Sequence, residues 1–377
     1  MISRRLALAR GACVLAAPFI NRGRFSLFAR GTLEYSTRTV DLIRQSTVID
    51  MLGLLTLDYR KLAACQNREA AFPAREFDLL KQSGVTIIHP AVGFTRGDVR
   101  TSSWGDITRW NHFVAAYSDR FLRVDGPADL AHAKASGKIG VIFGLQNSAH
   151  FETVADVDLF YAMGQRVSQL TYNNNPLGGG SGDPASGLTS YGAEVVQRMN
   201  QVGMAIDVSH CADRTTLDAI EASRKAVLVT HSNCRSLVPN SGRCKTDEAI
   251  RKLSEKGGVF GVTLVRTFVR ANGPATIEHV LQHIDHVVSI AGVEHVGLGT
   301  DVDQQGRERI GAPNLDLDGY DYSRKIFDLT EGLVRRNYTG ADIAAILGGN
   351  FRRALGEIWT TAPAPPQSEN HPSPSGR

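Results

Sequence analysis

Short runs of apolar and β-branched residues alternate along the chain with longer segments in which apolar residues recur every three or four positions. The short runs predict buried strands of a parallel sheet, and the longer segments predict amphipathic helices that cover it. Eight such runs occur, at residues 46–52, 85–90, 139–145, 167–171, 204–209, 226–231, 259–264 and 295–300. The helical pattern occurs at residues 104–122, 191–201, 213–223, 246–256, 276–291 and 323–336.

Eight strands with helices between them favour a closed barrel over an open, doubly wound sheet. A doubly wound nucleotide-binding fold would place a glycine-rich phosphate turn after an early strand, and none occurs there. We therefore predict an α/β protein, a single TIM-type (β/α)8 barrel, over residues 31–360.

The first 30 residues have the pattern of an export signal. Arg4 and Arg5 follow Ser3 and precede an apolar stretch, which is similar to a twin-arginine signal. We expect residues 1–30 to direct the protein to the periplasm or another exported compartment. An uncleaved surface helix on a cytoplasmic protein is the alternative. No other segment reaches the roughly 20 apolar residues needed to span a membrane.

Residues 361–377 are rich in proline and serine and carry too few apolar side chains to form a core. We expect a disordered tail there. The tail also lacks a hydrophobic end, which excludes the usual signal for a lipid anchor. The predicted order along the chain is therefore signal, barrel and tail.

Composition narrows the classes of partner. The chain has 42 basic and 38 acidic residues, for a net charge of +4, and no block of like charge. This balance argues against nucleic acid as a partner. A length of 377 residues fits a barrel of about 250 residues with long loops.

Five cysteines are too few for a disulfide framework in a domain of this size. Cys13 would leave with the signal. In an oxidising compartment the spacing of Cys234 and Cys244 would permit a disulfide, and free buried thiols are the alternative.

The residues that end the predicted strands carry the candidate chemistry, because active sites of these barrels lie at the carboxyl ends of the strands. His210 and His231 end neighbouring strands, and Asp301 follows two strands later. Imidazole and carboxylate groups suit zinc, so these three predict one zinc ion with an open position for water. Asp303 and His89 are weaker candidates: strand alternation favours Asp301 over Asp303, and a buried structural role suits His89 better.

Several segments resemble signatures of the membrane dipeptidase family: DVSH ending at His210, THSN beginning at His231, GLGTDVD around Asp301, and GGNFRRAL at residues 348–355. The resemblance implies a hydrolase of dipeptides, two zinc ions bridged by a glutamate, and a homodimer. It matches the two histidines to ligands of the second metal. It matches Asp301 to a ligand of the first metal that also accepts a proton, and Arg243 to the arginine that binds the carboxylate of the substrate.

The chain departs from this family at the first metal. Leu52 and Leu54 stand where the family has a His-x-Asp pair of ligands. Gln146 replaces the bridging glutamate and is a candidate metal ligand, but its single neutral carbonyl oxygen cannot bridge two cations as a carboxylate does. Tyr172 stands where family members often have a histidine that contacts the substrate, and its phenol could donate to a developing oxyanion.

Three functions remain open from the sequence. The first is a dipeptidase-like metal-dependent hydrolase of a dipeptide or small amide, with one zinc ion. The second is an exported enzyme that modifies a peptide-derived metabolite without hydrolysis, as some relatives are thought to do in siderophore maturation. The third is a catalytically silent protein that keeps the pocket for a ligand and holds no metal.

Overall fold

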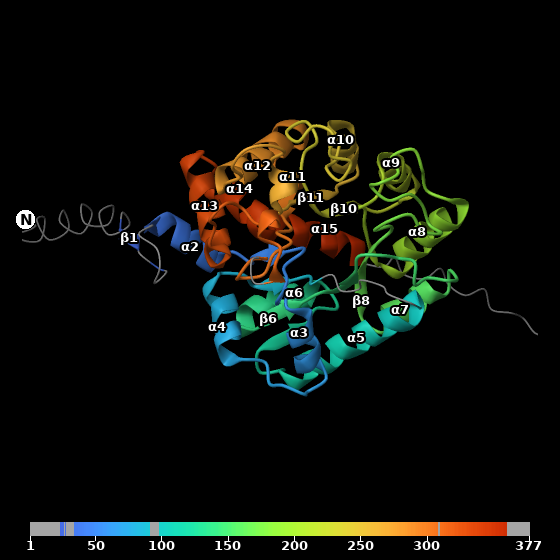
Figure 1. Cartoon of the computed structure of the whole chain (residues 1–377), viewed down its shortest axis with the longest axis horizontal. Coiled ribbons are helices and arrows are strands. Elements are labelled where there is room, and N and C mark those ends of the chain that lie inside the picture. The colour runs from blue at the N-terminus through green and yellow to red at the C-terminus, as the bar shows by residue number, and fades with distance from the viewer. Residues whose placement is uncertain (1–22, 26, 28–33, 91–97, 308–309, 360–377) are drawn as a thin grey trace, which may run out of the picture.

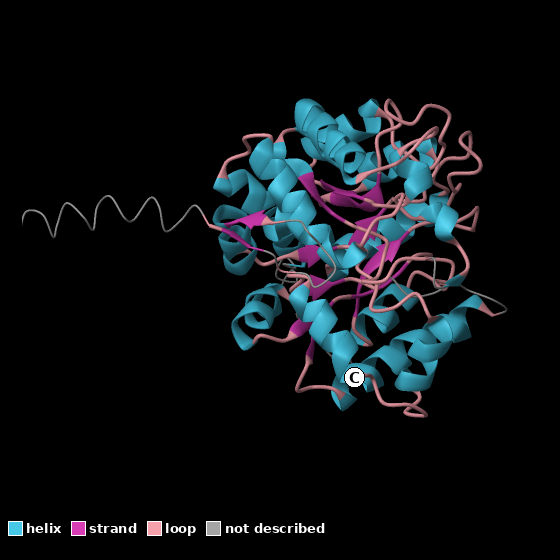
Figure 2. Ribbon diagram, turned by 60° about the vertical axis from the view of Figure 1, so that its left-hand side comes forward, coloured by secondary structure: helices cyan, strands magenta, loops and turns pink. Residues whose placement is uncertain are grey.

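The predicted barrel is confirmed by a computed structural model of the chain, which describes residues 23–25, 27, 34–90, 98–307 and 310–359. Strands lie in the middle of the molecule and helices surround them (Figures 1 and 2). Residues 1–22 of the predicted signal and the whole predicted tail lie outside the described residues.

The barrel strands all lie in the eight predicted runs or overlap them. They are β3 (Ile49–Asp50), β4 (Ile87–Ile88), β6 (Ile139–Val141), β7 (Phe143–Leu145), β8 (Gln165–Gln169), β9 (Ala205–Asp207), β10 (Val227–Ser232), β11 (Val259–Val262) and β12 (Val296–Leu298). Neighbours pair in parallel, with β12 returning to β3 through Leu298 and Asp50. Because β6 and β7 form one run interrupted at Ile142, and β6 pairs with β4 while β7 pairs with β8, the ring closes.

One further parallel strand, β5 (Phe121–Arg123), occupies the free edge of β6. The helix predicted over residues 104–122 is therefore wrong at both ends. The observed helix starts earlier, at Val99, because the Asp98 carboxylate accepts from the main-chain nitrogens of Arg100 and Thr101. It ends at Ala116, and the apolar residues that follow pair with the sheet instead.

Helices cover the outside of the barrel, and a small antiparallel pair, β1 (Arg24–Phe25) and β2 (Tyr35–Ser36), lies beside them (Figure 2). The helices are α2 (Thr37–Gln45), α3 (Tyr59–Gln66), α4 (Ala74–Gln82), α5 (Val99–Ala116), α6 (Pro127–Ser136), α7 (Asp156–Ala162), α8 (Ser190–Val202), α9 (Asp213–Ala222), α10 (Asp247–Glu255), α11 (Arg266–Val269), α12 (Ile277–Ala291), α13 (Lys325–Arg335), α14 (Gly340–Ala344) and α15 (Asn350–Trp359). Short 3-10 turns (Val293–His295, Pro313–Leu315 and Tyr322–Arg324) and a π turn (Ala345–Gly349) connect some of them. No helix among these is long and apolar enough to cross a membrane.

The GGNFRRAL segment holds the barrel together at the end of the strands away from the candidate chemistry. The Asn350 side chain donates to the main-chain oxygens of Val293 and Val296, at the start of β12. The Phe351 ring packs so closely on Gly297 that a side chain at that glycine would collide with it. This part of the motif is therefore structural.

The four cysteines within the described residues, Cys65, Cys211, Cys234 and Cys244, are buried free thiols. Of the two alternatives for Cys234 and Cys244, the structure thus has the free thiols. Burial raises the pKa of both, so each thiol keeps its proton at neutral pH.

His283 on α12 joins the loop after β10 to α11, the short helix that follows β11. Its Nδ1 accepts from the main-chain nitrogen of Cys234 at 3.1 Å, and its Nε2 donates to the Val269 oxygen at 3.0 Å. These two bonds require the neutral imidazole. Burial lowers the pKa of His283 to about 4.

We expect His283 to make the protein less stable in mild acid. Between pH 6.5 and about 4 the unfolded chain takes up a proton on this residue and the folded chain does not, so stability falls as the pH falls. The free energy of unfolding lost through His283 once the pH is below both pKa values is about 3 kcal/mol. Urea unfolding of the protein and of His283→Gln at pH 7, 6, 5 and 4.5 measures it. The variant is expected to show the shallower pH dependence, and equal slopes would refute the assignment.

Candidate functional site

Two histidines meet at the carboxyl ends of neighbouring strands. His231 lies in β10, and His210 lies three residues beyond β9. Their Nε2 atoms are 3.1 Å apart, and both side chains are buried. The register between β9 and β10 brings the two imidazoles together. It aligns Asp207 with Leu228, so His210 and His231, each three residues further on, lie at the same height in the barrel.

A buried carboxylate below the histidines sets the orientation of His231. Asp207 accepts from the main-chain nitrogen of Thr230 at 3.0 Å and from its hydroxyl at 2.7 Å. Because that hydroxyl donates to Asp207, its oxygen accepts from Nδ1 of His231 at 2.8 Å. The proton of His231 is therefore on Nδ1, and the lone pair of Nε2 faces His210.

Both imidazoles are neutral at pH 7. Burial lowers the pKa of His210 and of His231 well below the usual value, and the nearby Arg243 guanidinium lowers both further. Neutral imidazole nitrogen is the form of histidine that binds a metal ion.

Tyr172 covers the outer face of His210. The two rings are stacked, with centroids 4.0 Å apart and an angle of 21° between their planes. Burial raises the pKa of the Tyr172 phenol, so it keeps its proton and can donate a hydrogen bond. This position suits the contact with substrate that the sequence predicts for Tyr172.

Arg243 is fixed against the same strand ends. Its Nη1 donates to the Ser209 oxygen and its Nη2 to the His231 oxygen, both at 2.7 Å. The guanidinium lies over the Phe268 ring, 5.1 Å from its centre. Nε is buried, and among the described residues no group accepts its hydrogen. A guanidinium held this rigidly is suited to bind a carboxylate with little loss of entropy.

Asp301 follows β12 and is paired with an arginine. Its carboxylate lies 3.1 Å from Nη2 of Arg307, and the same nitrogen donates to its main-chain oxygen. Its φ of 57° is unusual for a residue other than glycine, and the Leu52 oxygen accepts from its main-chain nitrogen at 2.8 Å. Burial raises the pKa of Asp301, and Arg307 opposes that rise.

Comparison with known proteins identifies the lineage. The model of the membrane dipeptidase family, peptidase family M19, matches residues 40–369. The chain belongs to this family. A dipeptidase of Schizosaccharomyces pombe is 31% identical over 264 residues, which cover 67% of this chain and 60% of that protein. Dipeptidase 3 of Rattus norvegicus is 30% identical over 230 residues, or 59% of this chain and 45% of that protein. The matched region is thus less than two thirds of either relative.

Solved structures show the same fold. An amidohydrolase from Pseudomonas aeruginosa has a TM-score of 0.74 and 27% identity, over 85% of this chain and 99% of that chain. A metallopeptidase from Rhodobacter sphaeroides, solved with a phosphinate mimic of the dipeptide L-Ala-D-Ala, has a TM-score of 0.71 and 20% identity over 83% and 99% of the two chains. The resemblance to the membrane dipeptidases and the barrel fold are therefore confirmed.

The residues predicted to hold a metal ion are only partly assembled. Within the described part of the chain, no three His, Cys, Asp or Glu side chains are grouped so as to hold a metal ion. Of the predicted set, the structure brings His210 and His231 together, whereas the carboxylate of Asp301 is taken up by Arg307. Zinc–nitrogen bonds are about 2.0–2.1 Å long, so nitrogens 3.1 Å apart can share one ion.

The side of the site nearest Asp301 does not fit a second ion. Leu52, Leu54 and Leu57 form a buried apolar cluster there. Gly53 pairs with Val302, so these leucines run directly alongside the strand that carries Asp301. Apolar side chains and a buried guanidinium both disfavour a cation, so the donor set fits at most one metal ion.

Gln146 and His89 lie at neighbouring strand ends. Gln146 is buried just after β7, where its main-chain oxygen accepts from the Gln169 amide at 2.5 Å; its role as a ligand stays a prediction. His89 binds the Met51 oxygen through Nδ1 at 2.7 Å, and its Nε2 packs against Gly144. These contacts favour the structural role for His89. Asp303 is also structural, since its carboxylate accepts from the main-chain nitrogens of Leu57, Gln305 and Gly306.

Sequence reasoning missed two residues at the site. Arg307 acts electrostatically on Asp301, Tyr172 and His231. Tyr59, at the start of α3, is 47% exposed, and partial burial together with the nearby Asp301 carboxylate raises its pKa to about 12. Neither residue ends a strand, so no pattern in the sequence pointed to them.

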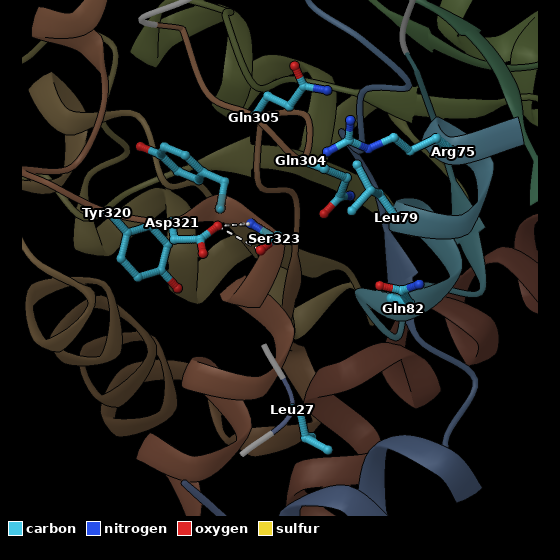
Figure 3. Close-up of a pocket in the computed structure, with 10 residues that line it drawn as sticks. Leu27, Arg75, Leu79, Gln82, Gln304, Gln305, Tyr320, Asp321 and Ser323 are labelled. Carbon is cyan, nitrogen blue, oxygen red and sulfur yellow. Dashed lines mark hydrogen bonds between the residues drawn. The ribbon is translucent and has the colours of Figure 1, made fainter. Parts of the chain in front are cut away.

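A cavity of about 610 Å³ lies beside α4 and the loop after β12 (Figure 3). Its lining comes from α4, from the loop after β12 and from the segment before α13, and includes Arg75, Gln304, Gln305 and Asp321. None of His210, His231, Asp301 or Arg307 lines it. This cavity is therefore separate from the histidine pair.

Proposed function

We propose that this protein is a dipeptidase-like hydrolase of a dipeptide or related small amide, working in an exported compartment with one metal ion at His210 and His231. The observation that carries the proposal is the meeting of two neutral imidazoles, with their Nε2 atoms 3.1 Å apart, at the carboxyl end of the barrel. Membership of the membrane dipeptidase family supports it. Zinc is the ion that this nitrogen pair suits.

The surrounding residues have distinct tasks in this proposal. His210 and His231 would hold a divalent ion, which would supply Lewis acidity to the substrate amide. Arg243 holds the carboxylate end of the substrate, and the Tyr172 phenol donates to the amide oxygen as it gains charge. Asp301, partly buried and held by Arg307, accepts a proton from the attacking water and returns it to the leaving amine.

Metal analysis combined with a dipeptide assay tests this proposal. We expect purified protein to contain about one zinc per chain, to cleave dipeptides, and to lose cleavage when a chelator removes the metal. A Gln146→Glu variant adds a carboxylate at one of the replaced family positions. Since Leu52 and Leu54 remain, we expect its metal content to stay near one. Cleavage by metal-free protein would refute the proposal.

A ligand-binding protein without catalysis is the second candidate function. The pairing of Asp301 with Arg307 favours it, because this ion pair engages the carboxylate that a hydrolase would use as a metal ligand and proton acceptor. Calorimetry with dipeptides separates the two candidates. Metal-free protein that binds dipeptides and cleaves none would establish the second.

A further inference from the structure

Arg307 is a buried cation, and one nitrogen of its guanidinium has no acceptor among the described residues. Only 7% of its surface is exposed. Nη2 is used by Asp301, through both its main-chain oxygen and its carboxylate. Nη1 is buried, and within the described residues nothing accepts from it. A buried guanidinium nitrogen without an acceptor is costly, so such groups in folded proteins almost always meet a partner, which is a protein group, an ordered water or a ligand.

Arg307 belongs to the candidate site through Asp301, whose main-chain oxygen and carboxylate both accept from its Nη2. It follows β12, whereas Arg243 follows β10, and β11 lies between these two strands in the ring. The site therefore has two separate buried guanidinium groups, and each has a nitrogen without an acceptor.

We infer that Arg307 binds a second carboxylate of the ligand, so that the preferred substrates are dipeptides with an acidic side chain. The inference rests on the proposed function for the presence of a dipeptide. Arg243 takes the terminal carboxylate, and Arg307 takes the side-chain carboxylate of a glutamate or aspartate. Asp301 holds the guanidinium in place, which leaves its Nη1 edge for the ligand. Guanidinium and carboxylate form short, charge-assisted hydrogen bonds, so the gain in affinity depends on the charge of the side chain.

Matched dipeptides test the inference. Alanyl-glutamate is compared with alanyl-glutamine, and glutamyl-alanine with glutaminyl-alanine, because each pair differs only in the charged group. KM and kcat are measured for peptides that are cleaved, and Kd by calorimetry for peptides that are not. We expect at least one acidic member to have a KM or Kd about tenfold lower than its amide partner, and Arg307→Met to remove that difference.

Arg214→Met is the matched control, since Arg214 is also paired with an aspartate, Asp218, but is 68% exposed on α9. It is expected to keep the preference. Arg307→Lys keeps the positive charge, so it serves as a second variant if Arg307→Met does not fold. We expect Arg307→Lys to retain part of the preference for acidic peptides. Equal affinity for the acidic and amide peptides in the unaltered protein would overturn the inference, as would a preference that survives Arg307→Met.

The two proposals can fail separately. If the protein binds acidic dipeptides more tightly than their amide partners but cleaves none, the proposed hydrolase is refuted and the role of Arg307 is supported. Cleavage with equal KM values for acidic and amide peptides would keep the hydrolase and remove the role of Arg307.

Discussion

His231→Ala is expected to abolish metal binding and to lower dipeptide turnover by about a thousandfold or more, the scale on which removal of an electrostatic catalytic group acts. His231 is the better anchored of the two histidines, because the Asp207 and Thr230 side chains fix its tautomer and direct its Nε2 lone pair towards His210. Without it a single imidazole remains, and one nitrogen ligand does not retain a divalent ion against water.

Thr230→Val supplies the matched control for this result. It keeps both histidines and removes only the hydroxyl that accepts from Nδ1 of His231. We expect zinc affinity to fall by about 10- to 100-fold, as is typical when the partner of a ligating histidine is removed. Metal content after dialysis and turnover with added zinc measure both variants. Turnover that is unchanged in His231→Ala would show that the histidine pair is not the reaction centre.

Asp50→Ala is expected to lower the free energy of unfolding by about 3–5 kcal/mol. Asp50 is fully buried and joins the first and last strands of the barrel. Its carboxylate accepts from the Thr300 nitrogen at 2.8 Å and hydroxyl at 2.6 Å. The buried ammonium of Lys325 lies 3.8 Å away. Removing the carboxylate leaves that charge in the core without its ion-pair partner and weakens the closure of the ring.

The double variant Asp50→Ala, Lys325→Met separates the two costs. It removes the uncompensated charge and leaves only the lost hydrogen bonds, so part of the lost stability should return. Guanidinium chloride unfolding of the two single variants and the double variant gives the coupling energy. A loss below about 1 kcal/mol for Asp50→Ala would show that the barrel closes without this carboxylate.

The strand pattern was predictable because each barrel strand is buried on both faces, which leaves a short, continuous apolar run in the sequence. The histidine pair was predictable for a related reason: both residues directly follow such runs, and parallel strands place their ends together. β5 was not predictable, since Phe121 and Leu122 also continue the helical spacing of the preceding segment. Only the free edge of β6 decides that they form a strand.

The sequence by itself determined the barrel and its lineage, and it predicts the loss of ligands at Leu52, Leu54 and Gln146. Each of these follows from the residue type at a position fixed by a local pattern. The tertiary structure alone decided that Asp301 pairs with Arg307 and that the leucines fill the adjoining space. That pairing depends on a left-handed backbone at Asp301 and on a loop that turns Arg307 back into the core. Neither the turn nor the burial of a loop arginine leaves a periodic signal in the sequence.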